Sequence, residues 1–111
     1  MRVTVRSETG IQRDVDAIID TGFNGFLTLP SEIITELKLS FSATADVVLG
    51  DGAGTRLSVY QAAIRIAGRD IDAEVLETEG GSLVGMQALQ GLDLSIQVIP
   101  DGDVGLQLHA Q

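Results

Sequence analysis

The chain contains no cysteine and no tryptophan, and only 4% of its 111 residues are aromatic. Without cysteine it has no disulfides, no thiol nucleophile and no cysteine-ligated zinc site. Because aromatic side chains are scarce, the core is expected to consist of Val, Ile, Leu and Ala. Hydrophobic residues still make up 44% of the sequence, which argues against a disordered chain.

Positive charge is also scarce, since 7 Lys and Arg face 16 Asp and Glu and the net charge is −9. Nucleic acids and anionic membranes attract basic surfaces, so neither is an expected partner. No apolar run approaches the roughly 20 residues that span a bilayer, and residues 1–10 lack the apolar centre of a signal peptide. These absences favour a cytoplasmic location.

Short segments with the character of β-strands fill most of the sequence. The length suits one domain, residues 1–111. One short helix is expected over residues 30–39, where Pro30 and Ser31 stand at its start, and one or two helical turns are expected between Gly85 and Gly91. Few helical crossovers separate the strands, which favours a mostly-β barrel or sandwich over a parallel α/β fold. The expected strands are residues 2–6, 11–19, 71–78, 93–100 and 104–110, besides a hairpin over 44–66.

The tip of that hairpin is rich in glycine. Two β-rich runs flank Gly50, Asp51, Gly52, Ala53 and Gly54, a composition typical of a flexible turn. A phosphate-binding loop is excluded, because no Lys followed by Ser or Thr stands in the required place.

A carboxylic acid stands directly behind an apolar run in the segment VDAIIDTGFNGFLTLP, residues 15–30. Placing the charge of Asp20 there is costly unless the carboxylate is paired or shares a proton. One interpretation is that Asp20 is an Asx-type turn residue that ends a strand. The other is that Asp20 performs chemistry. A second apolar run, LVGMQAL, ends at Gly85 later in the chain.

The order of these features resembles the retropepsin-like aspartic proteases. An Asp-Thr-Gly tripeptide follows an apolar strand, a glycine-tipped hairpin comes next, and an apolar strand ending in Gly leads into helical turns. The segments IIDTGFNGFLTLP and LVGMQAL together are similar to the small, single-lobe prokaryotic branch, and the resemblance extends from about Val3 to Val98. It implies a closed β-barrel with one or two short helices, assembled as a homodimer.

The resemblance also implies an activity, the hydrolysis of peptide bonds by a water placed between two carboxylates that share one proton. Asp20 is then the catalytic residue. The sequence has no second Asp-Thr-Gly or Asp-Ser-Gly, so the other carboxylate must be Asp20 of a second copy. Thr21 is expected to form a hydrogen bond across the two-fold axis, and the N–H of Gly22 to approach the carboxylate. No cofactor and no metal is implied.

Two further segments receive roles from the same resemblance. Leu83, Val84 and Gly85 are expected to pass behind the Asp20 loop and support it. The segment from Gly50 to Gly54 becomes a flap that closes over a polypeptide substrate, which binds as an extended strand.

Two positions depart from the family pattern. Phe23 follows the tripeptide where retroviral proteases have Ala and pepsins have Ser or Thr, so a hydroxyl bond to the carboxylate is missing. Gln87 stands where Asn or Asp is common. A pepsin-like acid optimum is therefore not assumed.

A second function stays open, a non-catalytic dimerisation or peptide-binding module with the same fold. The intact Thr21 and Gly22 favour the enzyme. A third possibility, that this chain is an acidic decoy or a toxin–antitoxin partner, rests on net charge alone. His109 is expected to be a tail residue, because zinc-protease and serine-triad motifs are absent around it. Leu106 and Leu108 are expected in the core or in a sheet shared by the dimer.

Overall fold

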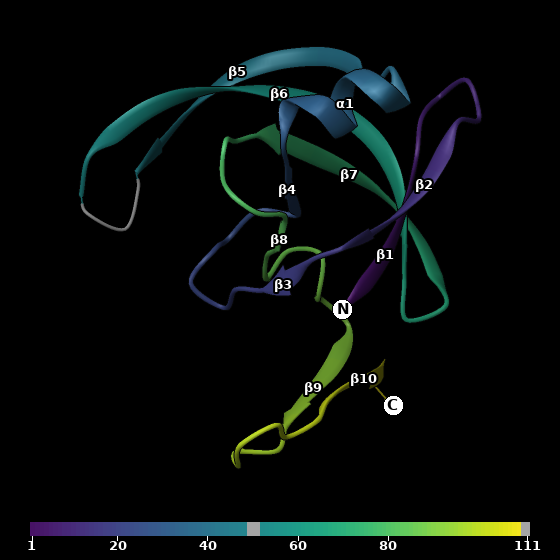
Figure 1. The fold of residues 1–111 in the computed structure, drawn as a ribbon, viewed down its shortest axis with the longest axis vertical. Helices are drawn as coiled ribbons and strands as arrows, with labels where there is room; N and C mark the ends of the chain where they lie inside the picture. The colour runs from purple at the N-terminus through teal and green to yellow at the C-terminus, as the bar shows by residue number, and fades with distance from the viewer. Residues whose placement is uncertain (49–51, 110–111) are drawn as a thin grey trace.

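The computed structural model describes residues 1–48 and 52–109 and is dominated by one sheet of eight strands (Figure 1). The hydrogen-bonded order is β2-β1-β6-β7-β4-β8-β3, and β5 pairs with β6. A separate sheet contains β9 and β10 alone. The strands are β1 (Arg2–Arg6), β2 (Gln12–Asp16), β3 (Ile18–Ile19), β4 (Leu27–Leu29), β5 (Ser40–Val48), β6 (Gly54–Ile66), β7 (Arg69–Glu77), β8 (Leu83–Val84), β9 (Leu92–Ile96) and β10 (Val104–Leu108).

The described part of the chain contains one α-helix, α1 (Ser31–Leu37). The mostly-β class and the helix that follows Pro30 are therefore confirmed. Between the end strands β2 and β3 no ladder is formed by the described residues, so closure of the sheet into a barrel stays a prediction.

The core is aliphatic, as the scarcity of aromatic residues predicts. In β1 the side chains of Val3 and Val5 are fully buried, while Arg2 and Arg6 are exposed, which is the period-two alternation of a strand with one face against the core. The helix contributes Ile34 and Leu37 to the same cluster. The largest fully buried side chains are Leu27, Leu29, Leu37, Ile64, Ile66, Val3, Val5, Val75 and Val84.

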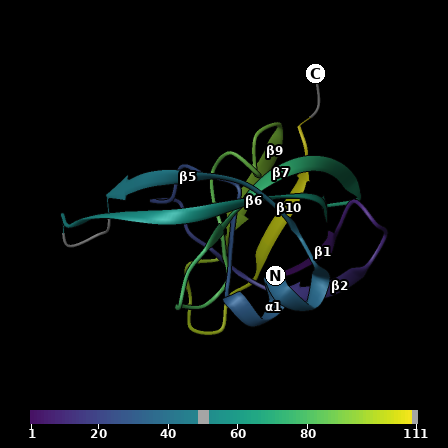
Figure 2. The same ribbon diagram turned by 90° about the horizontal axis from the view of Figure 1, so that it is seen from above.

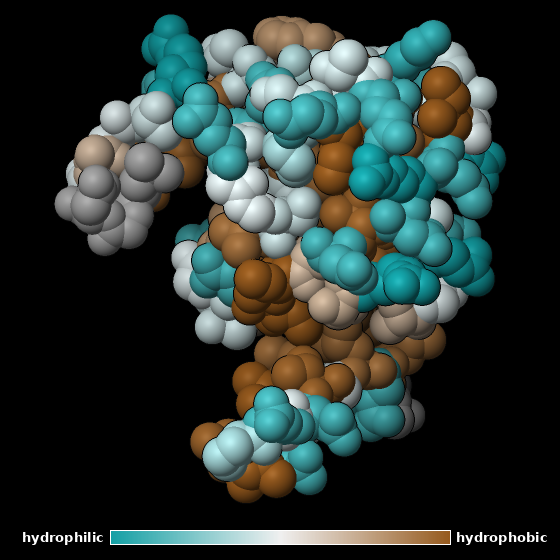
Figure 3. Space-filling view, viewed as in Figure 1, coloured by the Kyte–Doolittle hydropathy of each residue, from teal (hydrophilic) through white to brown (hydrophobic). Residues whose placement is uncertain are grey.

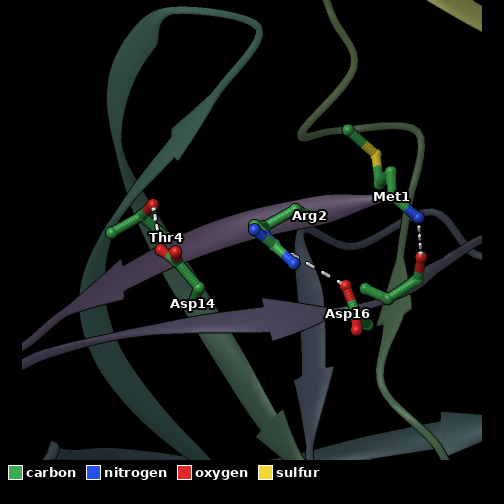
Figure 4. A network of polar contacts seen from close by, with 6 residues as sticks. Met1, Arg2, Thr4, Asp14 and Asp16 are labelled. Carbon is green, nitrogen blue, oxygen red and sulfur yellow. Dashed lines mark hydrogen bonds and ion pairs between the residues drawn. The ribbon is translucent and has the colours of Figure 1, made fainter.

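The segment 11–19, expected as one strand, is divided at Ala17. The Met1 nitrogen donates to the Ala17 oxygen at 2.6 Å, and the Ala17 N–H donates to the Met1 oxygen at 2.8 Å. Beyond this point the backbone changes partners, because the N–H of Ile18 donates to the Ser82 oxygen at 3.0 Å. Figure 4 shows this corner, where the ion pair of Arg2 with Asp16 also lies. The backbone therefore stops pairing with the start of the chain at Ala17 and pairs with β8 from Ile18 onward, immediately before Asp20.

The helical turns expected before Gly91 form a run of tight turns. The N–H of Ala88 donates to Gly85 and that of Leu89 to Met86, so the bonds join residues three apart and no α-helix forms there. Within residues 1–48 and 52–109, no helix is long and apolar enough to cross a membrane.

The β5–β6 hairpin is confirmed. Its register runs from Ser40 opposite Gln61 to Val48 opposite Gly54, with an irregularity between Phe41 and Ala43. Figures 1 and 2 show it extending as an arm beyond the rest of the sheet.

Candidate active site

Strand β8 lies between the two strands that enclose the Asp20 loop. It runs parallel to β3, with Ile19 opposite Val84, and antiparallel to β4, with Leu27 opposite Val84. The N–H of Asp20 donates to the Val84 oxygen at 2.9 Å. The structure thus brings Leu83 and Val84 against the loop, which is held at both its entry and its exit.

The carboxylate of Asp20 is half-buried at the start of a tight turn. The N–H of Gly22 donates to Oδ1 of Asp20 at 2.9 Å, and the N–H of Phe23 donates to the backbone oxygen of Asp20 at 3.1 Å. A Cβ added at Gly22 would lie 3.3 Å from Oδ1, so the absence of a side chain permits this close approach. The Gly22 bond fixes the orientation of the carboxylate and leaves the other oxygen, Oδ2, for a further proton or a water.

Thr21 and Gly22 are exposed on the surface of the single chain. Among the described residues the hydroxyl of Thr21 has no hydrogen-bond partner. The loop therefore presents one carboxylate and one free hydroxyl to whatever lies against it.

Gly85 is packed against the loop more closely than any side chain would allow. A Cβ there would lie 2.2 Å from the Gly25 oxygen and 2.6 Å from Cδ2 of Phe23. The next two amides continue the contact, since the N–H of Met86 donates to Phe23 at 2.8 Å and that of Gln87 to Gly25 at 3.1 Å. Residues 85–87 thus form a backbone support under residues 23–25.

The expected flap is only partly described. Gly50 and Asp51 lie outside the described residues. Gly52 adopts a left-handed conformation with φ 86°, Ala53 follows it, and Gly54 begins β6. A hollow of about 570 Å³ is lined on one side by residues 55–58 of the arm and on the other by residues 77–80, with Ser31 also contributing. The hairpin and the hollow are observed, whereas the role of Gly52, Ala53 and Gly54 as a flap stays a prediction.

Within residues 1–48 and 52–109, no group of three or more His, Asp or Glu side chains is placed to hold a metal ion. Neither a protein family model nor a curated protein sequence matches the chain.

Solved structures of viral proteases, in contrast, resemble this fold. The simian foamy virus (mac) protease matches with a TM-score of 0.54 at 17% identity, over 80% of this chain and 91% of that one. The EIAV protease, in complex with an inhibitor, matches with a TM-score of 0.53 at 20% identity, over 81% and 83% of the two chains. The foamy viral protease-reverse transcriptase matches 91% of this chain with 14% of its own, at a TM-score of 0.56 and 18% identity. The chain has the retropepsin fold.

Phe23 takes a structural part in this retropepsin fold that the sequence did not indicate. A Cβ built on Gly25 would lie 2.6 Å from Cζ of Phe23, and one on Gly85 would lie 2.6 Å from Cδ2. The ring therefore covers two glycines of the loop and its support. The residue that lacks a hydroxyl for the carboxylate instead fills the space over this backbone contact.

Thr28 is a second support that sequence analysis missed. Its side chain is buried on β4, where Oγ1 accepts a hydrogen bond from the N–H of Leu83 at 2.9 Å and donates to the Gly81 oxygen at 3.3 Å. The available signal was a single polar residue within the apolar run FLTLP. Thr28 thus fixes the start of β8 relative to β4.

Arg69 is a third. Its guanidinium donates from Nη1 to the Gln90 oxygen at 2.6 Å and from Nη2 to the Ala88 oxygen at 3.0 Å. These bonds hold the turns after Gly85 against the start of β7. Since the sequence places Arg69 in an ordinary turn, nothing there indicates this contact.

Replacement of Thr28 by Val is expected to lower the free energy of unfolding by about 1 kcal/mol, because the half-buried N–H of Leu83 and the oxygen of Gly81 lose their side-chain partner while the side-chain shape is kept. Urea unfolding followed by circular dichroism measures the change. Thr44→Val is the matched control, since Thr44 is exposed on β5. Equal stability of the two variants would show that the Thr28 hydroxyl does not hold β8.

Proposed function

We propose that this chain is an aspartic endopeptidase, active as a homodimer in which Asp20 of each copy supplies one of two catalytic carboxylates. The observation that carries the proposal is the Asp20 carboxylate itself. It is oriented by the N–H of Gly22 on a loop that β8 braces, and it lies at the surface of a retropepsin fold. One chain presents a single such carboxylate, and a two-fold axis beside Asp20 would supply the second.

The chemistry requires the two carboxylates to hold one proton between them, since two charges at such close range do not both persist. The ionised carboxylate takes a proton from water as the water oxygen bonds to the peptide carbonyl carbon. The protonated carboxyl group gives its proton to the carbonyl oxygen. The tetrahedral adduct then breaks its C–N bond, and the leaving nitrogen takes up the proton that came from water. At the same time one hydroxyl of the adduct gives its proton to the carboxylate that had protonated the carbonyl oxygen, which leaves a carboxylic acid product and restores the single proton of the pair.

A polypeptide bound as an extended strand fits beside the arm. β6 pairs with β7 only from Val59 onward, so residues 54–58 have a backbone edge on the side away from β5. The hollow of about 570 Å³ lies between residues 55–58 and residues 77–80. A strand added there would be held by main-chain hydrogen bonds, with alternate side chains in the hollow. We retain the closed barrel, the cytoplasmic location and the flap as predictions that belong to this function.

The test is cleavage of an unfolded, fluorescently labelled polypeptide across roughly pH 4 to 8, a range that brackets plausible dyad pKa values. Activity per protomer is expected to rise in proportion to protein concentration below the dimer dissociation constant and to level off above it. Sedimentation velocity on the same samples gives the fraction of dimer. Constant activity per protomer in samples that sediment as monomers would contradict a shared site. A dimer that binds the polypeptide without cleaving it would favour the non-catalytic module.

A further inference from the structure

Asn24 is the only asparagine in the chain, and Gly25 follows it directly. The side-chain amide of an asparagine can react with the backbone nitrogen of the next residue, and glycine hinders this reaction least because it has no side chain. A larger residue at position 25 would collide with the ring of Phe23, since a Cβ there would lie 2.6 Å from Cζ. The packing of this ring over the loop therefore favours a glycine directly after Asn24.

The structure leaves the Asn-Gly pair accessible. Asn24 is exposed, and its side chain forms no hydrogen bond with the described residues. Within residues 1–48 and 52–109, the peptide group that joins Asn24 to Gly25 is not hydrogen-bonded through either its oxygen or its N–H. The loop between β3 and β4 lies at the edge of the body in Figure 1, and the same edge shows hydrophilic and neutral surface in Figure 3. This peptide group can therefore rotate without breaking a hydrogen bond to the rest of the described chain.

The carbonyl groups on either side of this peptide are held, in contrast. The oxygen of Phe23 accepts a hydrogen bond from the N–H of Met86 at 2.8 Å, and the oxygen of Gly25 accepts one from the N–H of Gln87 at 3.1 Å. Because the two donors are consecutive residues, the length of backbone between the two acceptors is matched to the support. The Gly25 oxygen would also lie 2.2 Å from a Cβ on Gly85, so this contact has no room for a longer loop.

We propose that Asn24 is a site of spontaneous deamidation, and that this modification limits the lifetime of the Asp20 site. The nitrogen of Gly25 gives its proton to solvent and bonds to Cγ of Asn24, while the side-chain NH₂ group takes up a proton from solvent and leaves as ammonia. The product is a cyclic imide. Water then adds to one of its carbonyl carbons, the C–N bond to that carbon breaks, and the nitrogen regains a proton. Opening at Cγ gives aspartate, whereas opening at the backbone carbonyl carbon gives isoaspartate.

The two products differ in the length of the main chain. Aspartate leaves the main chain unchanged and adds one negative charge. Isoaspartate carries the main chain through Cβ, which inserts one C–C bond of about 1.5 Å between the two held carbonyl groups. The bonds from Met86 and Gln87 are not expected to persist together with this extra length, so the loop separates from its support and Asp20 moves with it. The modification does not depend on the proposed function, but its effect on cleavage rests on that function.

The first test follows the mass of the tryptic fragment 14–38 while the folded protein is incubated near neutral pH. This fragment contains no glutamine, so a gain in mass from NH₂ to OH reports Asn24 alone. Deamidation of the folded chain is expected to proceed within about tenfold of its rate in urea, because an exposed peptide group without hydrogen bonds needs no unfolding to react. A larger protection by the fold would overturn the proposal. Asn24→Gln is the matched control, since its longer side chain cyclises far less readily, and its fragment is expected to keep its mass.

The second test measures what the modification does to the loop. Isoaspartate in fragment 14–38 is quantified by methylation with a protein isoaspartyl methyltransferase and S-adenosylmethionine. Urea unfolding of the aged native chain is expected to show a less stable fraction equal to the isoaspartate content. Fresh Asn24→Asp is expected to unfold as the fresh native chain does, and aged Asn24→Gln to keep its starting curve. Isoaspartate at position 24 with unchanged stability would overturn the loss of the support.

The cleavage assay separates this inference from the proposed function. If the fresh native chain cleaves a polypeptide, its rate is expected to fall as the square of the fraction without isoaspartate, because both chains of a dimer contribute a loop. Intact mass shows that self-cleavage is not the cause. A rate that stays constant as isoaspartate accumulates would overturn the limit on the lifetime of the site. If the fresh chain does not cleave, the proposed function fails, and the mass and unfolding measurements still decide whether Asn24 deamidates and releases the loop.

Discussion

Asp20→Asn is expected to reduce the rate of polypeptide cleavage by about a thousandfold or more, because this one change alters both carboxylates of the dimeric site. An amide neither takes a proton from water nor gives one to the carbonyl oxygen, and positioned acid–base groups contribute roughly 10²–10⁴ each. The fold is expected to persist, since an Asn oxygen can still accept the hydrogen bond that the N–H of Gly22 donates to Oδ1.

The matched control is Asp16→Asn, which removes an exposed carboxylate that lies 3.9 Å from Arg2. Such surface pairs contribute little to stability, so this variant is expected to cleave as the native chain does. Sedimentation velocity verifies that Asp20→Asn still forms dimers. If Asp20→Asn kept more than a tenth of the native rate while Asp16→Asn kept all of it, Asp20 would not be the catalytic group.

Mixing the two proteins tests the sharing of the site directly. With equal amounts of native chain and Asp20→Asn, random pairing leaves about a quarter of the dimers fully native. Relative to the native chain alone at the same total protein concentration, activity is expected to fall to that quarter once the subunits have exchanged. A fall to one half would show that each chain works alone.

The Asp20 loop and its support were predictable because their signals are local. An apolar run that stops at Asp-Thr-Gly, and another that stops at Gly85, indicate where strands end, and the order of the two resembles one known family. Leu83 and Val84 do lie against the loop. Their role in catalysis, like that of Thr21 and Gly22, stays a prediction.

The remaining features depend on contacts between residues far apart in the sequence. The break at Ala17 arises because its backbone pairs with Met1 while Ile18 pairs with the segment before β8, and no local pattern encodes this change of partner. Thr28 and Arg69 were missed for the same reason, since the backbone groups they bind lie 19 to 55 residues away along the chain.

The separation of β9 and β10 from the main sheet was also not predictable. Leu106 was expected in the core or in a dimer sheet, and it does pack against the core, whereas Leu108 is 60% exposed. The alternation of residues in these strands indicates a sheet, but it does not indicate which strands they pair with, and β9 and β10 pair only with each other among the described residues.

Gly85→Ala is expected to lower the free energy of unfolding by about 3 kcal/mol or more and to abolish cleavage. Its Cβ would lie 2.2 Å from the Gly25 oxygen, a backbone atom that cannot rotate away as a flexible side chain can. Overpacking of this kind usually costs about 1–3 kcal/mol, and contact with fixed backbone places the change at the upper end or beyond. Relief requires moving the loop away from its support, and the Asp20 carboxylate moves with the loop.

Gly81→Ala separates this contact from the general effect of replacing glycine. A Cβ at Gly81 meets nothing within 4 Å, and its backbone does not adopt the left-handed conformation. Alanine at such a site is expected to be neutral or to stabilise by up to about 1 kcal/mol, because it restricts the unfolded chain. Urea unfolding and the cleavage assay are run on both variants. Equal stability would mean that the loop and β8 do not pack as closely as 2.2 Å implies, and a stable, active Gly85→Ala would remove β8 as the support that positions Asp20.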